Sequence, residues 1–348
     1  MQLQTLANKI SEINYRRKIS AQHTTGKIHY VHEPDQKEIK EILKKRLKNY
    51  KNDFQNLAKS NSIKSPFLEI GAEYSLASSY LKSKFKADGV ACDISLHSLT
   101  KAKHFARIFK LKKIPTLVCA DADNLPFKSN SSPFIFVYES LHHFPNPKNP
   151  LKSLNRVLSP GGTLLIGTEP IKPGLKLNLW NRPNKLRPFE KILKALLVLP
   201  FVSSIGKTEI DHGIIETSFS IQTWINSLSI FDKYYLTIDV FPLGQVQKIT
   251  KADSKLNLIT KVLIFTLGGT IKAVCHKKNS KVPKTKSSEM VYICPECLNK
   301  VQKEIELISV SKDYHCPNCK TSYPNIEGMP IFLPPSLQRT LQKKLRSQ

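Results

Sequence analysis

Four cysteines near the C-terminus stand in two closely spaced pairs. The segments YICPECLNK and YHCPNCK each hold a Cys-x-x-Cys turn, and 18 residues separate the two turns. Each turn can present two thiolates, so the two together supply the tetrahedral four-sulfur set that Zn²⁺ prefers. The N-terminal segment has no apolar stretch typical of a secretory signal, which favours metal ligation over disulfides. We predict a structural zinc site whose ligands are Cys294, Cys297, Cys316 and Cys319.

A second group of residues with chemical potential lies where apolar runs end. FLEIG contains Glu69 and Gly71, VACD ends with Asp93, and VCAD ends with Asp121. Asp93 follows Gly71 by 22 residues, about the distance at which dinucleotide-binding sheets place an acid on a ribose. The carboxyl ends of parallel strands meet at one sheet edge, where open α/β sheets bind ligands. The sequence therefore predicts a ligand site at that edge.

The elements that must position these acids alternate along residues 66–168. Strands are expected at 66–71, 88–93, 115–120, 133–138 and 162–168. Helices are expected at 97–110 and 149–158. Such alternation is typical of an α/β fold, with a parallel sheet covered by helices on both faces.

The flanking segments differ in character. Residues 35–58 predict an amphipathic helix with a capping box at Asp35 and Glu38. The proline-containing stretch 170–232 is interpreted as an insertion or lid, in which Ser220 begins a short helix, and the runs 234–241 and 258–269 are expected to be closing strands. The expected organisation is a helical extension at 1–60, an α/β domain at 61–275, a basic linker at 276–289, a zinc unit at 290–335 and a basic tail at 336–348.

Residues 66–168 resemble class I S-adenosylmethionine-dependent methyltransferases, in the broad group that includes quinone-biosynthesis enzymes. The resemblance is carried by FLEIGAEYS, VACDIS, ADADNLPF, YESLHHFPNP and LNRVLSPGGTLLI, in this order and at fitting distances. It implies a Rossmann-like sheet of seven strands with helices on both faces. It also implies S-adenosyl-L-methionine as the cofactor and methyl transfer as the reaction.

The resemblance carries cofactor roles over to particular residues. It implies that Asp93 accepts hydrogen bonds from the ribose hydroxyls. Asp121 would accept from the adenine amino group, and the backbone amide of Ala122 would face the adenine ring. Glu69 and Gly71 would lie at the methionine end.

Two departures from the family pattern concern the loop after the first strand and the fourth strand. Glu73 and Ser75 stand where the family has glycines, which bring the backbone close to a ligand. A carboxylate at 73 would repel the cofactor's own carboxylate, unless it points outward or pairs with the cofactor's ammonium group. In the fourth strand, Ile135 stands where relatives often have an aspartate.

Several side chains are candidates for taking a proton from the acceptor. The resemblance places Glu139 on the floor near the transferred methyl, beside Tyr138, which is predicted to bind the cofactor, and His143 follows them in the same segment. His212, in the acid-flanked EIDHG of the insertion, is another candidate. The further candidates are His142, Glu169 and Asp211. The catalytic prediction names His143, Glu139 and His212.

The segment after the fourth strand also bears on the acceptor. An Asn/Asp-Pro-Pro-Tyr/Phe motif, typical of enzymes that methylate exocyclic amines of bases, is replaced by YESLHH. We therefore expect a small-molecule, lipid or glycan-precursor acceptor. The YPNIEGMPIFLPP segment after the last cysteine resembles the small zinc-ribbon partner of tRNA and translation-factor methyltransferases. This leaves open a protein partner that binds through the ribbon.

Charge and hydropathy set the remaining expectations. The net charge is +27, which permits a nucleic-acid partner but is also what a lysine-rich composition produces. The longest strongly apolar run, ALLVLPFV, is too short for a membrane span, so we expect a cytoplasmic protein. Two alternatives stay open: an RNA methyltransferase that uses the ribbon and lysines, and a catalytically degenerate zinc-ribbon binding protein.

Overall fold

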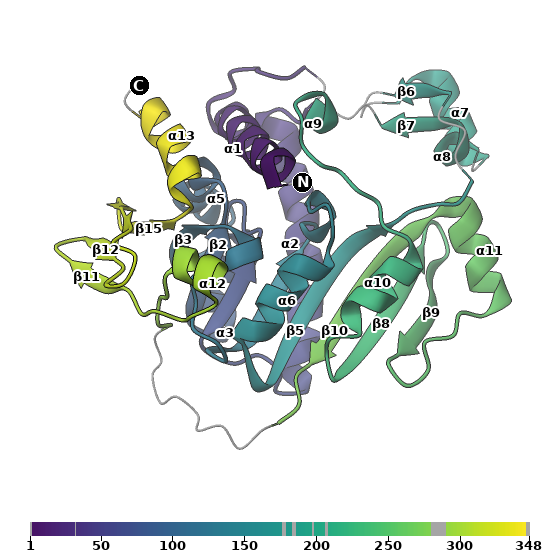
Figure 1. Cartoon of the computed structure of the whole chain (residues 1–348). Helices are drawn as coiled ribbons and strands as arrows, with labels where there is room; N and C mark the ends of the chain where they lie inside the picture. Colours follow the sequence, from purple (N-terminus) through teal and green to yellow (C-terminus); the bar gives the residue numbers. More distant parts are fainter. Residues whose placement is uncertain are drawn as a thin grey trace.

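The fold is built on one large sheet that receives strands from three parts of the chain (Figure 1). The structure is a computed structural model that describes residues 2–31, 33–175, 179–182, 186–196, 198–205, 208–279 and 290–345. In these residues the main sheet has ten strands in the order β14-β15-β3-β2-β1-β4-β5-β10-β8-β9. No described helix combines the length and apolar character needed to cross a membrane.

Six of the ten strands of the main sheet match predicted runs. Its bounds in chain order are β1 Phe67–Ile70, β2 Gly89–Asp93, β3 Thr116–Ala120, β4 Ser132–Tyr138, β5 Leu158–Ile171, β8 Lys233–Val240, β9 Gly244–Thr250, β10 Gly269–His276, β14 Asn325–Ile326 and β15 Met329–Phe332. Strands β3, β2, β1, β4 and β5 run parallel, and β10 is antiparallel to both β5 and β8. The predicted Rossmann-like sheet is confirmed, and β9, β14 and β15 extend it beyond seven strands.

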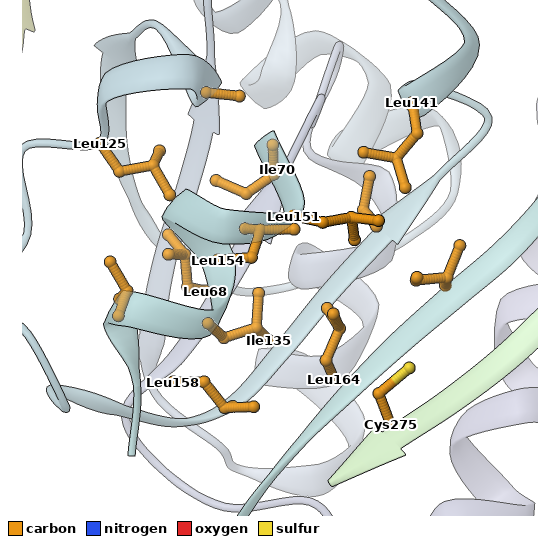
Figure 2. Close-up of a cluster of buried hydrophobic side chains, with 14 of the residues drawn as sticks. Leu68, Ile70, Leu125, Ile135, Leu141, Leu151, Leu154, Leu158, Leu164 and Cys275 are labelled. Atoms are coloured by element: carbon orange, nitrogen blue, oxygen red, sulfur yellow. The ribbon is translucent and has the colours of Figure 1, made fainter. Parts of the chain in front are cut away.

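Alternation along the central strands gives each face of the sheet its own core. Leu68, Ile70 and Ile135 belong to one buried cluster, whereas Phe67 and Phe134 belong to the other. Successive side chains of a strand point to opposite faces, so a short apolar run buries both faces of the sheet. Figure 2 shows that leucines of a helix cover the first face of the sheet, and that Ile135 of β4 points toward these leucines. Ile135 is thus a core residue.

Helices cover both faces. Their bounds are α1 Gln2–Thr25, α2 Gln36–Lys59, α3 Leu76–Phe85, α4 Leu96–Thr100, α5 Ala102–Ile108, α6 Lys148–Val157, α7 Pro188–Ala195, α8 Leu199–Val202, α9 Thr208–Asp211, α10 Ile221–Leu228, α11 Leu258–Leu267, α12 Pro295–Val301 and α13 Pro335–Leu345, with short 3₁₀ turns η1 Ala122–Asn124 and η2 Leu141–His143. In Figure 1, α6 and α10 lie in front of the sheet and α2 and α3 behind it.

Local signals account for several helix ends. The side chain of Asp35 accepts from the amides of Lys37 and Glu38, and the side chain of Glu38 accepts from the amide of Asp35, which confirms the capping box. The side chain of Ser220 caps α10 as predicted. The helix expected at 97–110 is divided at Lys101 into α4 and α5.

The prediction of a strand at 258–269 is wrong, because this segment forms α11. The side chain of Asn257 caps the helix through the amide of Thr260, and Gly268 ends it with a φ of 71°. The run LITKVLIFTL is apolar on all sides, so its periodicity does not separate helix from strand. The closing strand is instead β10, which reaches into the expected linker. Residues 280–289 of that linker and residues 346–348 of the tail lie outside the described part of the chain.

The insertion at 170–232 contains helices α7 to α10 and a small parallel pair, β6 Trp180–Arg182 and β7 Ser203–Ile205. Residues 176–178, 183–185, 197 and 206–207 of this insertion are outside the described residues. The last part of the insertion, from α9 to α10, returns the chain to the main sheet through the bridge between Ile171 and Phe219.

The zinc unit is built into the sheet. Its own antiparallel strands are β11 Ile308–Val310, β12 Asp313–His315 and β13 Ser322–Tyr323. After β13 the chain forms the short strand β14 at the edge of the main sheet and then β15, which pairs with β14 and, in parallel, with β3 (Figure 1). Residues of the unit, among them Cys294 and Phe332, belong to the same buried cluster as Leu125 and Phe127. The unit and the α/β domain therefore share a core.

Candidate functional site

A cavity of about 450 Å³ opens at the carboxyl ends of the central parallel strands. Glu69, Gly71, Asp93, Asp121 and Ala122 all line it, so the residues predicted to form the edge site lie around one space. Strand β1 lies between β2 and β4, the point at which the strand order reverses. Open α/β sheets bind ligands in the crevice at that point.

The loop after β1 adopts left-handed backbone at alternate residues. The φ angles are 67° at Gly71, 47° at Glu73 and 55° at Ser75. A Cβ at position 71 would lie 1.9 Å from the hydroxyl oxygen of Ser140, so only glycine fits there. Glu73 and Ser75 hold a left-handed conformation that favours glycine, at a cost of ~1–2 kcal/mol each for a residue with a Cβ.

The carboxylate of Glu73 is engaged by two arginines. Its oxygens lie 3.2 Å from Nη1 of Arg46 and 3.9 Å from Nη1 of Arg16. Nη2 of Arg46 lies 2.7 Å from Glu139, which also lines the cavity. Arg46 therefore joins the first loop to the end of β4, and it partly neutralises both carboxylates.

Two acids at the end of the central strands are held by backbone amides. Asp93 accepts from the amides of Glu73 and Ser95, both at 2.8 Å, and burial raises its pKa to about 6. Glu69 accepts from the amide of Ser78 at 3.2 Å. Burial raises the pKa of Glu69 to about 8, and the nearby charge of Asp93 adds to this. At neutral pH Glu69 is thus mostly protonated and Asp93 mostly ionised.

The acid after β3 already has a cationic partner. The ammonium of Lys9, from α1, lies 2.6 Å from Asp121 and 2.8 Å from Asp123. Asp121 also accepts from the amide of Asp123, which fixes the 3₁₀ turn that begins at Ala122. A ligand amine that approaches Asp121 must share this carboxylate with Lys9.

The end of β4 forms another wall of the cavity. Tyr138 lines it, packs on Tyr50 with 4.5 Å between ring centroids, and donates its hydroxyl to Asp53 at 3.2 Å. Glu139 has a φ of 47°, and its amide donates to the carbonyl of Gly167. The left-handed turn at Glu139 directs the chain from β4 into η2.

Two histidines follow in η2 and face the same cavity. Glu169 is fully buried and accepts from the amides of Ser140, Leu141 and His142. It also lies 2.9 Å from Nδ1 of His142. Burial opposes the imidazolium of His142, but Glu169 outweighs this and raises the His142 pKa. Burial lowers the pKa of His143 to about 4, so this ring is neutral at physiological pH.

The structure does not bring His212 to the cavity. Its exposed side chain packs edge-on against Tyr30, with ring centroids 4.5 Å apart, and lies near Tyr15. Gly213, with a φ of 77°, turns the chain directly after it, and the residues of this segment that line the cavity are Glu209 before it and Ile215 and Glu216 after it. Asp211 is also exposed outside the lining. The expectation that His212 acts as a base is corrected on this geometry.

Sequence reasoning missed the charged residues that helices α1 and α2 contribute to the cavity lining. One face of α1 contributes Lys9, Glu12 and Arg16, which are three and four residues apart, and α2 contributes Arg46. Such spacing places side chains on one helix face. The spacing of the charged residues in α1 was a usable signal for a charged helix face. The residues that they meet in the cavity come from distant segments of the sequence.

The cavity is acidic although the chain is strongly basic. Its lining holds three lysine or arginine residues, Lys9, Arg16 and Arg46, beside the two histidines. The eight carboxyl residues are Glu12, Glu69, Glu73, Asp93, Asp121, Glu139, Glu209 and Glu216. Glu69 is mostly protonated, but the other carboxylates still outnumber the lysine and arginine cations, and such an excess between low-dielectric walls favours a cationic ligand.

The four predicted zinc ligands converge in the second site. Sγ of Cys294 lies 3.5 Å from that of Cys319, Sγ of Cys297 lies 3.6 Å from that of Cys316, and all four are within 4.8 Å of one another. Thiolates at Zn–S distances of about 2.3 Å in a tetrahedron lie about 3.8 Å apart, so the cluster fits zinc closely.

Backbone and side-chain donors surround this sulfur cluster. The amide of Cys297 donates to Cys294, and the amide of Cys319 donates to Cys316, as in two matching knuckles. The hydroxyl of Tyr323 lies 3.3 Å from Sγ of Cys294. These contacts orient the thiolates for a structural ion.

Comparisons with known proteins agree with the geometry. Residues 68–166 match the family model described as a methyltransferase domain. The chain is 30% identical over 101 residues to chloroplastic tocopherol O-methyltransferase of Arabidopsis thaliana, covering 29% of each chain. It is 27% identical over 142 residues to methyltransferase GfsG of Streptomyces halstedii, covering 41% of this chain and 50% of that protein. The chain thus spans half or less of the length of these relatives.

Among solved structures, the chain is similar to geranyl diphosphate C-methyltransferase from Streptomyces coelicolor A3(2). The TM-score is 0.41 at 11% sequence identity, and the match covers 65% of this chain and 77% of that one.

Proposed function

We propose that this chain, whose residues 68–166 belong to the methyltransferase domain family, transfers a methyl group from S-adenosylmethionine to a small-molecule acceptor. The observation that carries the proposal is the convergence of Glu69, Gly71, Asp93 and Asp121 around one cavity at the strand-order reversal. Within this class we favour an acceptor that is a free metabolite, a lipid or a glycan precursor.

The adenosine half of the cofactor would bind at the ends of β2 and β3. Asp93 would accept from the ribose hydroxyls. The hydrogen bonds that it accepts from two backbone amides already hold its carboxylate in place. Asp121 would accept from the adenine amino group beside Ala122, and would share its charge with Lys9. Charge-assisted bonds of this kind contribute ~1.5–3 kcal/mol each.

The methionine half would lie along the loop after β1. At Gly71 there is no space for a Cβ, because the backbone lies directly against the side chain of Ser140. Glu73 is bound by Arg46 and Arg16, which reduces its repulsion of the cofactor's carboxylate. The excess of carboxylates in the lining favours the sulfonium, whose positive charge is lost on transfer.

Transfer is an in-line displacement in which the acceptor forms a bond to the methyl carbon. The methyl–sulfur bond breaks, and its electron pair stays on sulfur. The chain's task is to align donor and acceptor and to remove a proton where the acceptor carries one. Glu139, His142 and His143 line the cavity at the end of β4 and are the candidates for this task.

The four-cysteine cluster would hold a structural Zn²⁺. Its closed ligand set leaves no position for a substrate. Because β15 pairs with β3, the ion would stabilise the strand that carries Asp121 at its end.

An RNA acceptor is not favoured. The curated relatives include a tocopherol O-methyltransferase, and an acidic lining repels the phosphates that an RNA strand would bring with it. A degenerate binding protein remains the other alternative, since Glu73 and Ser75 replace family glycines.

Calorimetric titration with S-adenosylhomocysteine tests the cofactor site. We expect binding to the native chain and a loss of at least about tenfold in Asp93→Asn, equal to ~1.4 kcal/mol. Asp253→Asn, an exposed loop aspartate, is the matched control and should bind normally. Absence of binding at millimolar ligand would leave the degenerate binding protein as the better interpretation.

Labelled S-adenosylmethionine then tests transfer. Incubation with a metabolite extract and, separately, with total RNA should label the small-molecule fraction and leave the RNA unlabelled. Label in RNA alone would reverse the order of the two enzyme hypotheses.

A further inference from the structure

Three side chains of metal-ligand type meet at the end of the cavity beside β4. They are His142 and His143 of η2 and Glu216 of the insertion, and their ligand atoms lie within 4.8 Å of one another. The two imidazole rings are 4.3 Å apart at their centroids. All three residues line the cavity.

Hydrogen bonds fix which nitrogen each imidazole presents. Nδ1 of His143 lies 3.0 Å from the carbonyl oxygen of Ile215, and a carbonyl can only accept, so this Nδ1 carries the hydrogen. Nδ1 of His142 lies 2.9 Å from Glu169, whose oxygens already accept three backbone amides, so this Nδ1 is also a donor. In each neutral ring the lone pair is then on Nε2.

This arrangement is the one that metal-binding histidines use. A ligating imidazole almost always donates its other N–H to a carboxylate or a backbone carbonyl, which fixes the ring and raises its basicity. His142 has the carboxylate partner and His143 has the carbonyl partner. Two adjacent histidines with both kinds of support are not needed for packing alone.

The carboxylate of the group is placed by the same segment. The carbonyl of Ile215 binds His143, and the amide of Thr217 donates to the carbonyl of His142 at 2.9 Å. Glu216 stands between these two bonds, so its backbone is held against η2. The neighbouring acids Glu12 and Glu209 also line the cavity, which adds to the preference for a cation.

We propose that His142, His143 and Glu216 bind a divalent transition-metal ion through two imidazoles and one carboxylate. Such a ligand set leaves coordination positions open, unlike the closed four-thiolate site. Ligand atoms around a tetrahedral ion with bonds of about 2.0–2.2 Å lie about 3.3–3.6 Å apart, so side-chain rotations that bring the three groups closer by about 1 Å or slightly more would complete the site.

The ion's role rests on the proposed methyl transfer. An acceptor hydroxyl or enol would bind at an open position, where the ion favours loss of its proton to solvent. The oxygen would then form its bond to the methyl carbon as the methyl–sulfur bond breaks. The site therefore predicts an oxygen acceptor with a second oxygen or a carboxylate nearby that can join the coordination.

Metal counting with cobalt tests the site apart from any activity. The full-length protein is first loaded with one equivalent of zinc, which fills the four-cysteine site, and is then titrated with Co²⁺. We expect one further Co²⁺ per chain, without a thiolate-to-cobalt charge-transfer band. His143→Ala and Glu216→Gln should each weaken this binding by at least about tenfold, or ~1.4 kcal/mol, and should keep the zinc.

His212→Ala is the matched control, because this histidine lies on the same insertion but outside the cavity. It should bind cobalt normally. Thermal unfolding and S-adenosylhomocysteine binding show that each variant is folded. The proposal is overturned if no second Co²⁺ binds, if binding survives in His143→Ala and Glu216→Gln, or if cobalt enters only by displacing zinc. Cofactor binding without a second metal would refute this site alone, and a second metal without cofactor binding would refute the methyltransferase proposal alone.

Discussion

Position 71 combines two constraints on the first loop. Its φ is 67°, and a Cβ there would overlap Ser140. Gly71→Ala should therefore lower the free energy of unfolding by ~2–5 kcal/mol, the sum of backbone strain and overpacking, and should weaken cofactor binding. Thermal unfolding and calorimetry measure the two effects.

Gly244→Ala separates these two contributions. Gly244 has a similar φ of 75°, but a Cβ added there would have no other atom within 4 Å. This variant should lose only ~1–2 kcal/mol and should bind the cofactor normally. Equal losses in the two variants would show that the contact with Ser140 is unimportant.

The buried carboxyl of Glu69 makes stability depend on pH. Its pKa rises from 4.5 in the unfolded chain to about 8 in the folded one, so between these values the folded state holds a proton that unfolding releases. Its contribution to stability is therefore complete at low pH and decreases as pH rises, by up to ~1.4 kcal/mol per pH unit, until about pH 8.

Glu69→Gln, which resembles the protonated acid, should remove this dependence. Urea unfolding of both proteins from pH 5 to 8 measures it, because every other titrating group, including Asp93, is common to the two. We expect the stability of the native chain to fall relative to that of the variant across this range. Parallel curves would contradict the assignment of a protonated Glu69.

The acids of the cavity were predictable and their partners were not. Asp93 and Asp121 follow from a local pattern and one rule of topology, because strand ends of a parallel sheet share an edge. Lys9 is 112 residues from Asp121 in sequence, and its position depends on how α1 packs over the finished sheet. The left-handed backbone of Glu73 is not indicated by its residue type, and its alignment with a family glycine was the one signal for it.

At the scale of elements, the central strands could be predicted from the sequence and the edges of the sheet could not. Buried parallel strands are short continuous apolar runs, and β1, β2, β3 and β4 lie within a residue of the predicted bounds, whereas β5 is several residues longer than predicted. The segment 258–269 was ambiguous for the same reason, because an apolar run without alternation also suits a helix. The pairing of β15 with β3 joins residues about 210 apart, and no local pattern indicates it.

This pairing predicts that zinc removal weakens cofactor binding. The zinc unit has little core of its own, so it should lose its structure without the ion, and β15 should then leave β3. Since Ile331 and Phe332 pair with Cys119 and Ala120, directly before Asp121, the adenine end of the cavity would lose its support. We expect S-adenosylhomocysteine affinity to fall by at least about tenfold, or ~1.4 kcal/mol.

The measurement compares chelator-treated protein with the same sample after one equivalent of zinc is restored. Cys319→Ser offers a second route, because Cys319 is the exposed ligand and its change leaves the buried core intact. Zinc should restore affinity in the native chain but not fully in the variant. Unchanged affinity in zinc-free protein would mean that the ribbon and the cofactor site are independent.

At the scale of the whole molecule, charge is separated between exterior and cavity. The chain carries a net charge of +27, whereas the cavity has eight carboxyl and three basic residues in its lining. A basic exterior attracts anions without sequence preference, and this attraction falls steeply with salt. The composition alone indicated only the exterior, because the acids that gather in the cavity come from segments far apart in the sequence.

The separated charge predicts how salt changes ligand preference. S-adenosylmethionine carries one more positive charge than S-adenosylhomocysteine, and that charge would lie among partly exposed carboxylates. Raising the salt concentration should therefore weaken binding of the sulfonium more than binding of the thioether, because screening acts on the extra charge.

Calorimetry of both ligands at low and high salt, about 0.05 and 0.5 M, measures the ratio of their affinities across a range in which the screening length changes severalfold. Glu209→Gln, which removes one lining carboxylate from the insertion, should reduce the salt dependence of that ratio, whereas Glu306→Gln on the exposed zinc unit should not. A ratio that is constant in salt for the native chain would show that the cavity is neutral to the cofactor despite its lining, for instance because its carboxylates are fully paired with Lys9, Arg16 and Arg46.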